Sequence, residues 1–160
     1  MRKFIIQAIL LLIVAAAALL IFKSGMEVNL PFLPERTVAK IVQINDAKIT
    51  VEIADTQDKR KKGLSGRQSI ASDGGMLFVF EKRGKYPFWM KGLTFPLDLI
   101  WIKDDKVSEI LENVPPPAGG QSDELLPIYQ SKEDIDKMLE VSAGTVRKFN
   151  IKPGDVIKII

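Results

Sequence analysis

The chain has 160 residues, of which 46% are apolar and 27% charged, and it contains neither cysteine nor histidine. This composition excludes disulfide bonds, thiolate or imidazole metal sites and Ser-His-Asp catalysis, and we expect neither a metal nor a cofactor. The net charge of +3 comes from Arg2, Lys3 and Lys23, which leaves 20 of the 23 basic residues against 20 acidic ones. Such a balance gives no indication of nucleic-acid binding.

The segment Phe4–Phe22 is apolar and is interrupted only by Gln7. As a helix, its 19 residues would span about 28 Å, close to the hydrocarbon core of about 30 Å. Arg2 and Lys3 would also suit the start of a cleaved signal peptide, but the apolar segment exceeds the usual hydrophobic region of about 7–15 residues. We therefore predict an uncleaved transmembrane anchor over residues 1–23.

The charges that flank this segment predict its orientation. Arg2 and Lys3 precede it, whereas Lys23 alone follows. The positive-inside rule then places the N-terminus in the cytoplasm and the C-terminal domain outside the cell membrane, which the chain crosses once. Residues 24–37 carry two prolines without periodicity and predict a tether, and residues 38–160 predict one globular domain.

Short β-rich segments with intervening turns dominate residues 38–160. Asp55-Thr56 predicts the start of a helix over 57–62 that ends at Gly63, and residues 143–150 predict a second helix. Residues 135–141 fit a strand or a helix equally well. We predict a mainly β domain with one or two short helices, either a small β-sandwich or a partly open barrel. The predicted strands are 38–44, 48–54, 76–80, 86–91, 97–103, 107–114 and 156–160.

Several ordered sequence blocks resemble a known family. They are the pattern DT…R…GL.GR from Asp55 to Arg67, then GMLFVF at 75–80, FWMK at 88–91, PLD at 96–98, AGT at 143–145 and GD at 154–155. Together they resemble the bacterial and archaeal domain-of-unknown-function family 192 over residues 38–160. The resemblance implies a small, mostly β domain, often preceded by a membrane anchor or signal sequence, and it supplies no reaction. Ser65 stands where the family usually has Met, and Gly92-Leu93 where it tends to have Asn-Thr.

The block around Trp89 is a candidate binding surface. In a strand, Trp89 and Lys91 would share one face, and Phe88 and Met90 the other. A tryptophan beside a lysine could stack against a planar or sugar ligand and hold its polar groups. Alternatively, Trp89 is half-buried at the edge of the core and the lysine extends past it.

Asp98 is a second candidate, because an ionised carboxylate in an apolar strand is costly unless it is paired. Arg67 and Lys91 are its candidate partners, and a buried Asp–Arg pair could simply fix the helix onto the sheet while Asp55 caps that helix. In the functional alternative, charged residues converge beside Trp89 as a pocket for a polar or anionic ligand. The charged residues of this predicted pocket are Asp55, Arg60, Arg67, Lys91 and Asp98.

Three functions follow from these patterns. The first is a membrane-anchored domain that binds a small polar ligand or a protein partner at the cell envelope. The second is a hydrolase of envelope glycan that uses Asp55 and Asp98 as acid and base. The third is a structural accessory that docks on another membrane protein through residues 4–22.

Overall fold

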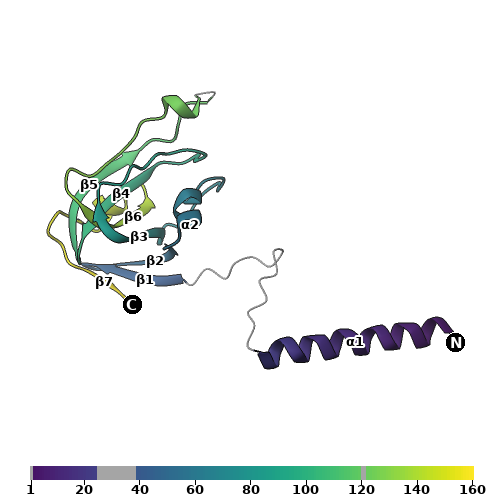
Figure 1. Cartoon of the computed structure of the whole chain (residues 1–160). Helices are drawn as coiled ribbons and strands as arrows, with labels where there is room; N and C mark the ends of the chain where they lie inside the picture. Colours follow the sequence, from purple (N-terminus) through teal and green to yellow (C-terminus); the bar gives the residue numbers. More distant parts are fainter. Residues whose placement is uncertain (1, 25–38, 120–121) are drawn as a thin grey trace. The chain divides into compact units, whose positions relative to one another are not determined.

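The computed structural model describes residues 2–24, 39–119 and 122–160 (Figure 1). The chain divides into two units, Met1–Arg36 and Thr37–Ile160. In the first unit, helix α1 covers Arg2–Ser24 and exposes large apolar side chains, such as Phe4 at 77% and Leu11 at 71%. Apart from Ser24, the predicted tether of residues 24–37 lies outside the described residues.

Within these described ranges, no helix combines the length and the apolarity that crossing a membrane requires.

The second unit is built on a seven-stranded sheet with the order β5-β4-β6-β3-β2-β1-β7 (Figure 1). All neighbouring strands are antiparallel except β2 and β3, which run parallel. The helices are α2 (Gln57–Lys62), the 3-10 helix η1 (Asp123–Leu125) and α3 (Thr145–Lys148). The strands are β1 (Ala39–Ile44), β2 (Ala47–Ala54), β3 (Gly74–Gly84), β4 (Leu97–Lys103), β5 (Lys106–Val114), β6 (Ile135–Ser142) and β7 (Ile157–Ile159).

The two edges of this sheet meet at one end. Lys106, the first residue of β5, forms an antiparallel bridge with Val156, directly before β7. The backbone N–H of Val107 donates to Asp155 O at 2.9 Å, and that of Ile157 donates to Asp105 O at 2.8 Å. The sheet therefore curls into a half-barrel. The prediction of a mainly β domain is confirmed, and of its two architectures the partly open barrel is the one found.

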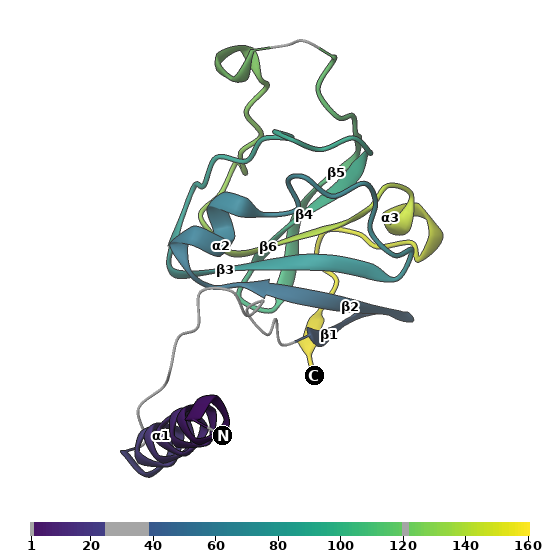
Figure 2. The same cartoon turned by 90° about the vertical axis from the view of Figure 1, so that its right-hand side faces the viewer.

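Both faces of the curled sheet are buried. Because side chains alternate along a strand, β3 places Leu77 in one hydrophobic cluster and Phe78 in another, and β6 divides Leu139 and Met138 in the same way. The first cluster includes Val146 of α3, and the second includes Leu64, which follows α2. Figure 2 shows α2 and α3 at separate places beside the sheet. Strands covered on both sides have nearly continuous apolar sequences, as in β4.

The segment 86–91, predicted as a strand, forms no ladder. Its one β-bridge pairs Phe88 with Tyr129, with N···O distances of 2.8 Å in both directions. The prediction was wrong because the edges that this segment would need on β3 are already taken by β2 and β6. The chain is nevertheless extended here, with Phe88 and Met90 buried and Trp89 exposed, so the predicted alternation of faces is correct.

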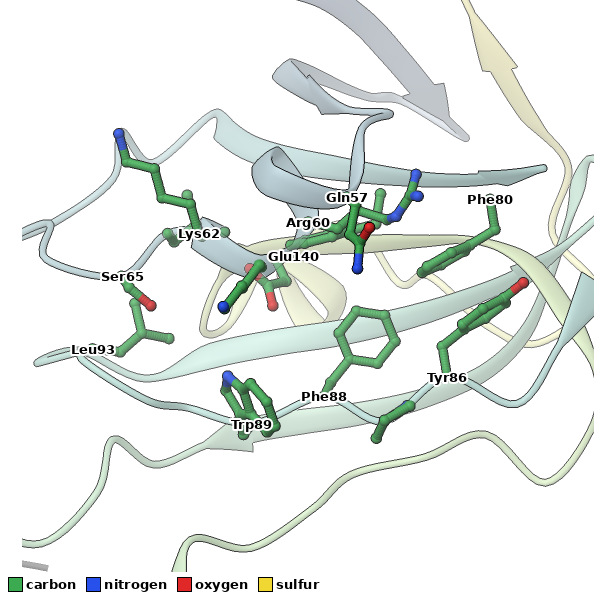
Figure 3. Close-up of a pocket in the computed structure, with 15 residues that line it drawn as sticks. Gln57, Arg60, Lys62, Ser65, Phe80, Tyr86, Phe88, Trp89, Leu93 and Glu140 are labelled. Atoms are coloured by element: carbon green, nitrogen blue, oxygen red, sulfur yellow. The ribbon is translucent and has the colours of Figure 1, made fainter. Parts of the chain in front are cut away.

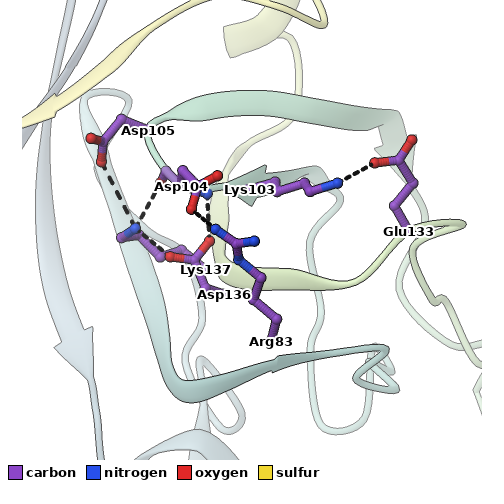
Figure 4. A network of polar contacts seen from close by, with 7 residues as sticks. All are labelled: Arg83, Lys103, Asp104, Asp105, Glu133, Asp136 and Lys137. Atoms are coloured by element: carbon purple, nitrogen blue, oxygen red, sulfur yellow. Dashed lines mark hydrogen bonds and ion pairs between the residues drawn. The ribbon is translucent and has the colours of Figure 1, made fainter.

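A network of charged residues holds the turn between β4 and β5 (Figure 4). The N–H of Asp104 donates to Asp136 Oδ1 at 2.7 Å, and the carboxylate of Asp104 pairs with Arg83 of β3. Lys137 Nζ donates to Asp104 O at 2.7 Å and to Asp136 Oδ2 at 2.6 Å. These bonds fasten the turn to β6 and β3, and every carboxylate in them is matched by a donor of the chain itself.

Candidate functional site

A cavity of about 520 Å³ lies between α2 and the second hydrophobic cluster (Figure 3). Its size falls within the range of about 300–1,000 Å³ that is usual for small-molecule sites. The lining comes from α2 and the residues after it, from β3, from the segment 86–93 and from Glu140 of β6. We call it the α2 cavity.

Local sequence signals set the position of α2 as predicted. The hydroxyl of Thr56 accepts a hydrogen bond from the N–H of Lys59 at 3.3 Å and so caps the first turn. Gly63 ends the helix with φ of 49°, a conformation that favours glycine. A Cβ at this position would also lie 3.4 Å from the ring of Phe78. The chain then turns inward, and Leu64 is buried.

Arg60 fixes the helix over the sheet. Its Nη1 donates to Asp55 O at 2.7 Å and to Val79 O at 2.8 Å, which joins the end of β2 to β3. The guanidinium also lies over the ring of Phe80, 5.3 Å from the centroid. Arg60 lines the cavity, but its hydrogen bonds identify it as a residue that positions the wall.

Aromatic side chains form much of that wall. Phe80 stacks on Tyr86 with 3.6 Å between centroids, and Phe78 meets Phe88 edge to face at 5.5 Å. These rings contact one another, and Phe80 also contacts Arg60. Trp89 differs, because 47% of it is exposed while it lines the cavity, which leaves it available to stack on a ligand.

Among the described residues that line the cavity, Glu140 is the buried polar one (Figure 3). It lies opposite Met76 of β3 and Leu99 of β4, and it is 5% exposed. Burial raises the pKa of this carboxyl to about 8. Within the described residues its oxygens have no hydrogen bond or ion pair. The floor of the cavity is therefore a carboxyl that is neutral at pH 7 and lacks a protein partner.

Sequence reasoning missed Glu140, although a signal was present. It lies between Leu139 and Val141 in an apolar segment, which is the argument that singled out Asp98. While residues 135–141 fitted either a strand or a helix, the face that this glutamate occupies could not be assigned. Its position became predictable only once the segment was found to be the central strand β6.

The structure does not bring the predicted pocket residues together. Arg60 and Trp89 line the α2 cavity, whereas the other four do not. Lys91 Nζ pairs with Asp123 at 2.5 Å. Asp55 pairs with Lys59 at 3.3 Å, and this hydrogen bond lowers the pKa of the aspartate.

Arg67 is engaged elsewhere on the sheet. It makes a two-pronged ion pair with Glu52, with 2.7 Å between Nη2 and Oε2. These hydrogen bonds lower the pKa of Glu52 and raise that of the arginine. Arg67 is therefore a partner of Glu52 and not of Asp98, and it borders a separate hollow next to β2.

Asp98 is fully buried, but the prediction of a cationic partner was wrong. Its Oδ1 accepts from the N–H of Asn113 at 2.8 Å, and its Oδ2 accepts from the N–H of Val146 at 2.9 Å. Backbone amides of β5 and of α3 thus satisfy the charge. Asp98 pairs in register with Val141, so it points to the face opposite Glu140. The predicted catalytic pair of Asp55 and Asp98 is not supported, because Asp98 is confined to this other face.

Fold and cavity together define a class of protein: a small half-barrel domain whose short helix closes a cavity over one face of the sheet. The sequence adds the family. The model of DUF192, described as "Uncharacterized ACR", matches residues 40–159. The chain belongs to the DUF192 family, as its sequence blocks indicated.

Two solved structures share this fold. One is a protein of Sinorhizobium meliloti 1021 that is named as a candidate transcription regulator. It is 31% identical, the match covers 79% of this chain and 98% of that protein, and the TM-score is 0.70. The other is a protein of unknown function from Novosphingobium aromaticivorans DSM 12444, with 25% identity, coverage of 79% and 89%, and a TM-score of 0.65. No curated protein matches the chain.

Proposed function

We propose that the domain binds a small molecule in the α2 cavity, with Glu140 as the hydrogen-bonding group at the floor and Trp89 as the stacking wall. The observation that carries this proposal is the buried, unpartnered carboxyl of Glu140. A carboxyl in this position is free to donate a hydrogen bond into the cavity, and a ligand oxygen can accept it.

The chemistry of the lining limits the ligand. A neutral carboxyl donates one hydrogen bond, which suits a hydroxyl or carbonyl oxygen. The aromatic wall and the exposed face of Trp89 suit a ring with an apolar face. We therefore expect a ring compound with several oxygens, which is the description of a sugar.

Binding is favoured over hydrolysis of envelope glycan. Glycoside hydrolysis needs two carboxyl groups that flank the scissile bond. In the part of the chain that the structure describes, Glu140 is the single carboxyl residue that lines the α2 cavity. Asp98 faces the other side of the sheet and is saturated by two backbone amides.

The charge of the domain argues against transcription regulation, the role in the name of the Sinorhizobium meliloti protein. Outside the first 24 residues the chain carries equal numbers of basic and acidic side chains. A nucleic-acid-binding domain depends on a surplus of basic groups.

Anchoring in the cell membrane, with this domain outside, belongs to the proposal. It is supported by the apolar segment Phe4–Phe22 and by the exposed apolar side chains of α1. The test is fractionation of cells that make the full chain, followed by protease treatment of intact cells. Replacement of Leu11 and Leu12 by Lys should move the protein from the membrane to the soluble fraction, and an unchanged membrane fraction would argue against the anchor.

Tryptophan fluorescence tests ligand binding directly, because the two tryptophans differ in exposure. Trp89 is 47% exposed and Trp101 is 2% exposed. A ligand in the α2 cavity should protect Trp89 of the full chain from acrylamide quenching. The probes are glucose, glucuronate, glucose 6-phosphate and glucosamine.

Two variants provide the controls. Trp89→Phe should abolish the protection and leave only the buried indole signal. Glu140→Ala should weaken binding about tenfold, since a hydrogen bond in a buried site contributes about 1 kcal/mol or more. If no probe protects Trp89 in a folded chain, small-molecule binding fails and a protein partner becomes the better candidate.

A further inference from the structure

We infer that the ligand of the α2 cavity is an anion: a small acidic ring compound, such as a sugar acid or sugar phosphate, whose charged group lies at Lys61 and Lys62. This inference rests on the proposed function and adds the charge of the ligand to it. The ring would occupy the space beside Trp89, and one of its oxygens would meet Glu140.

The four consecutive basic residues 59–62 have different roles. Lys59 pairs with Asp55, and Arg60 donates to two backbone carbonyls. Lys61 and Lys62 also line the cavity, and within the described residues neither has a hydrogen bond or a close ion pair. The charge of Lys62 lowers the pKa of Glu52, but it is the smallest of the causes. The hydrogen bonds of Glu52 come from Arg67.

Nothing in the described lining opposes these two charges at neutral pH. Glu140 is protonated there, and Gln57 and Ser65, which also line the cavity, are neutral. Lys61 and Lys62 are exposed, and we call their side of the cavity its mouth; the mouth is positive, whereas the floor at Glu140 is neutral. An amine ligand would meet only like charge, whereas an acidic ligand gains an ion pair at the mouth and keeps its hydrogen bond at the floor.

Glu140 and the two lysines offer a ligand different contacts. Burial alone raises the pKa of Glu140, with no lowering by a nearby cation. Glu140 thus keeps its proton at pH 7 although Lys61 and Lys62 line the same cavity. A ligand that uses both ends must place its charge away from the oxygen that accepts from Glu140, as a six-membered sugar with a terminal carboxylate or phosphate does.

Competition among charged and neutral sugars tests the inference on the full chain at pH 7. Affinity is measured from the protection of Trp89 against quenching. Glucuronate and glucose 6-phosphate should bind about three- to tenfold more tightly than glucose, and glucosamine should bind most weakly. Inorganic phosphate, which lacks a ring, should give no protection. Raising the salt concentration should reduce the preference for the acidic probes.

A matched pair of variants assigns the preference to the mouth. Lys61→Gln with Lys62→Gln should remove the advantage of the acidic probes over glucose. Lys48→Gln with Lys158→Gln removes the same charge at exposed positions that do not line the cavity, and it should change neither. If glucuronate and phosphate sugars differ from each other, the tighter one identifies the anionic group.

The two proposals fail in different ways. Equal binding of glucose and glucuronate, or tighter binding of glucosamine, would overturn the anionic ligand while leaving the binding site intact. A preference for acids that survives the Lys61 and Lys62 variants would also overturn it. Absence of protection by all the probes would overturn the proposed function itself.

Discussion

Asp98 and Glu140 are buried carboxyl residues on neighbouring strands of one sheet, but they differ in whether the protein supplies them with hydrogen-bond donors. Asp98, on β4, accepts from two backbone N–H groups and belongs to the face that packs against α3. Glu140, on β6, is one residue out of register with it and faces the α2 cavity without a protein donor. A buried carboxyl that the fold satisfies is part of the structure, whereas one that the fold leaves unsatisfied is available to a ligand.

The charged network around Asp104 supports this distinction. It holds several carboxylates at the other end of β4, yet each is matched by Arg83, Lys137 or a backbone amide. Abundance of charge therefore does not mark the site. What marks it is one buried carboxyl that lies between Met76 and Leu99 and faces the cavity.

The largest effect is expected at the satisfied carboxyl. Asp98→Ala leaves the N–H groups of Asn113 and Val146 buried without an acceptor. We expect a loss of about 3–5 kcal/mol in the free energy of unfolding, measured by urea denaturation. A loss below about 1 kcal/mol would show that Asp98 does not hold β5 and α3 together.

The pH dependence of stability should separate Glu140 from Asp98. The pKa of Glu140 is about 8 in the folded chain and 4.5 as its ordinary value. The folded state therefore binds the proton more tightly, and the stability that this provides is lost as the pH rises from 4.5 towards 8. In the Glu140→Gln variant this side chain cannot ionise, so its stability should not fall over this pH range for that reason.

The measurement is the difference in unfolding free energy between wild type and Glu140→Gln at pH 6 and at pH 7.5. We expect this difference to shift by about 2 kcal/mol in favour of the variant, at about 1.4 kcal/mol per pH unit. Parallel pH profiles of the two proteins would mean that the Glu140 carboxyl has a partner or is hydrated.

The smallest effect is expected at Arg67, a residue that the sequence placed in the pocket. Its ion pair with Glu52 is about a third exposed on both sides, at 35% and 32%. Arg67→Ala should therefore cost only about 0.5–1 kcal/mol and leave the protection of Trp89 by glucuronate unchanged. Weaker binding of glucuronate by this variant would show that Arg67 contributes to the binding site.

Local signals predicted the local elements well. The hairpin of β1 and β2, the Thr56 cap and the Gly63 end of α2 all follow from turn and capping chemistry that acts over a few residues. The alternation around Trp89 was also correct, although the segment pairs with no strand over its length. Patterns of this kind are decided within the segment that carries them.

The candidate site could not be predicted in the same way, because its contacts join distant parts of the chain. The donors to Asp98 come from Asn113 and Val146, 15 and 48 residues away, and a backbone amide leaves no trace in side-chain patterns. The strand order that places Glu140 beneath α2 is likewise set by pairing between β3, β6 and β4. For Asp98 we expected a cationic partner, but Arg67 pairs with Glu52 and Lys91 pairs with Asp123.

The most direct test of the central claim is a carboxyl-carbon NMR titration of Glu140 in the full chain, with and without glucuronate. The account predicts a midpoint near pH 8 without the probe, because burial raises this pKa. Glucuronate should raise the midpoint further, since it accepts a hydrogen bond only from the protonated form. A midpoint near 4.5, the ordinary value, or one that glucuronate leaves unchanged, would contradict a ligand site built on Glu140.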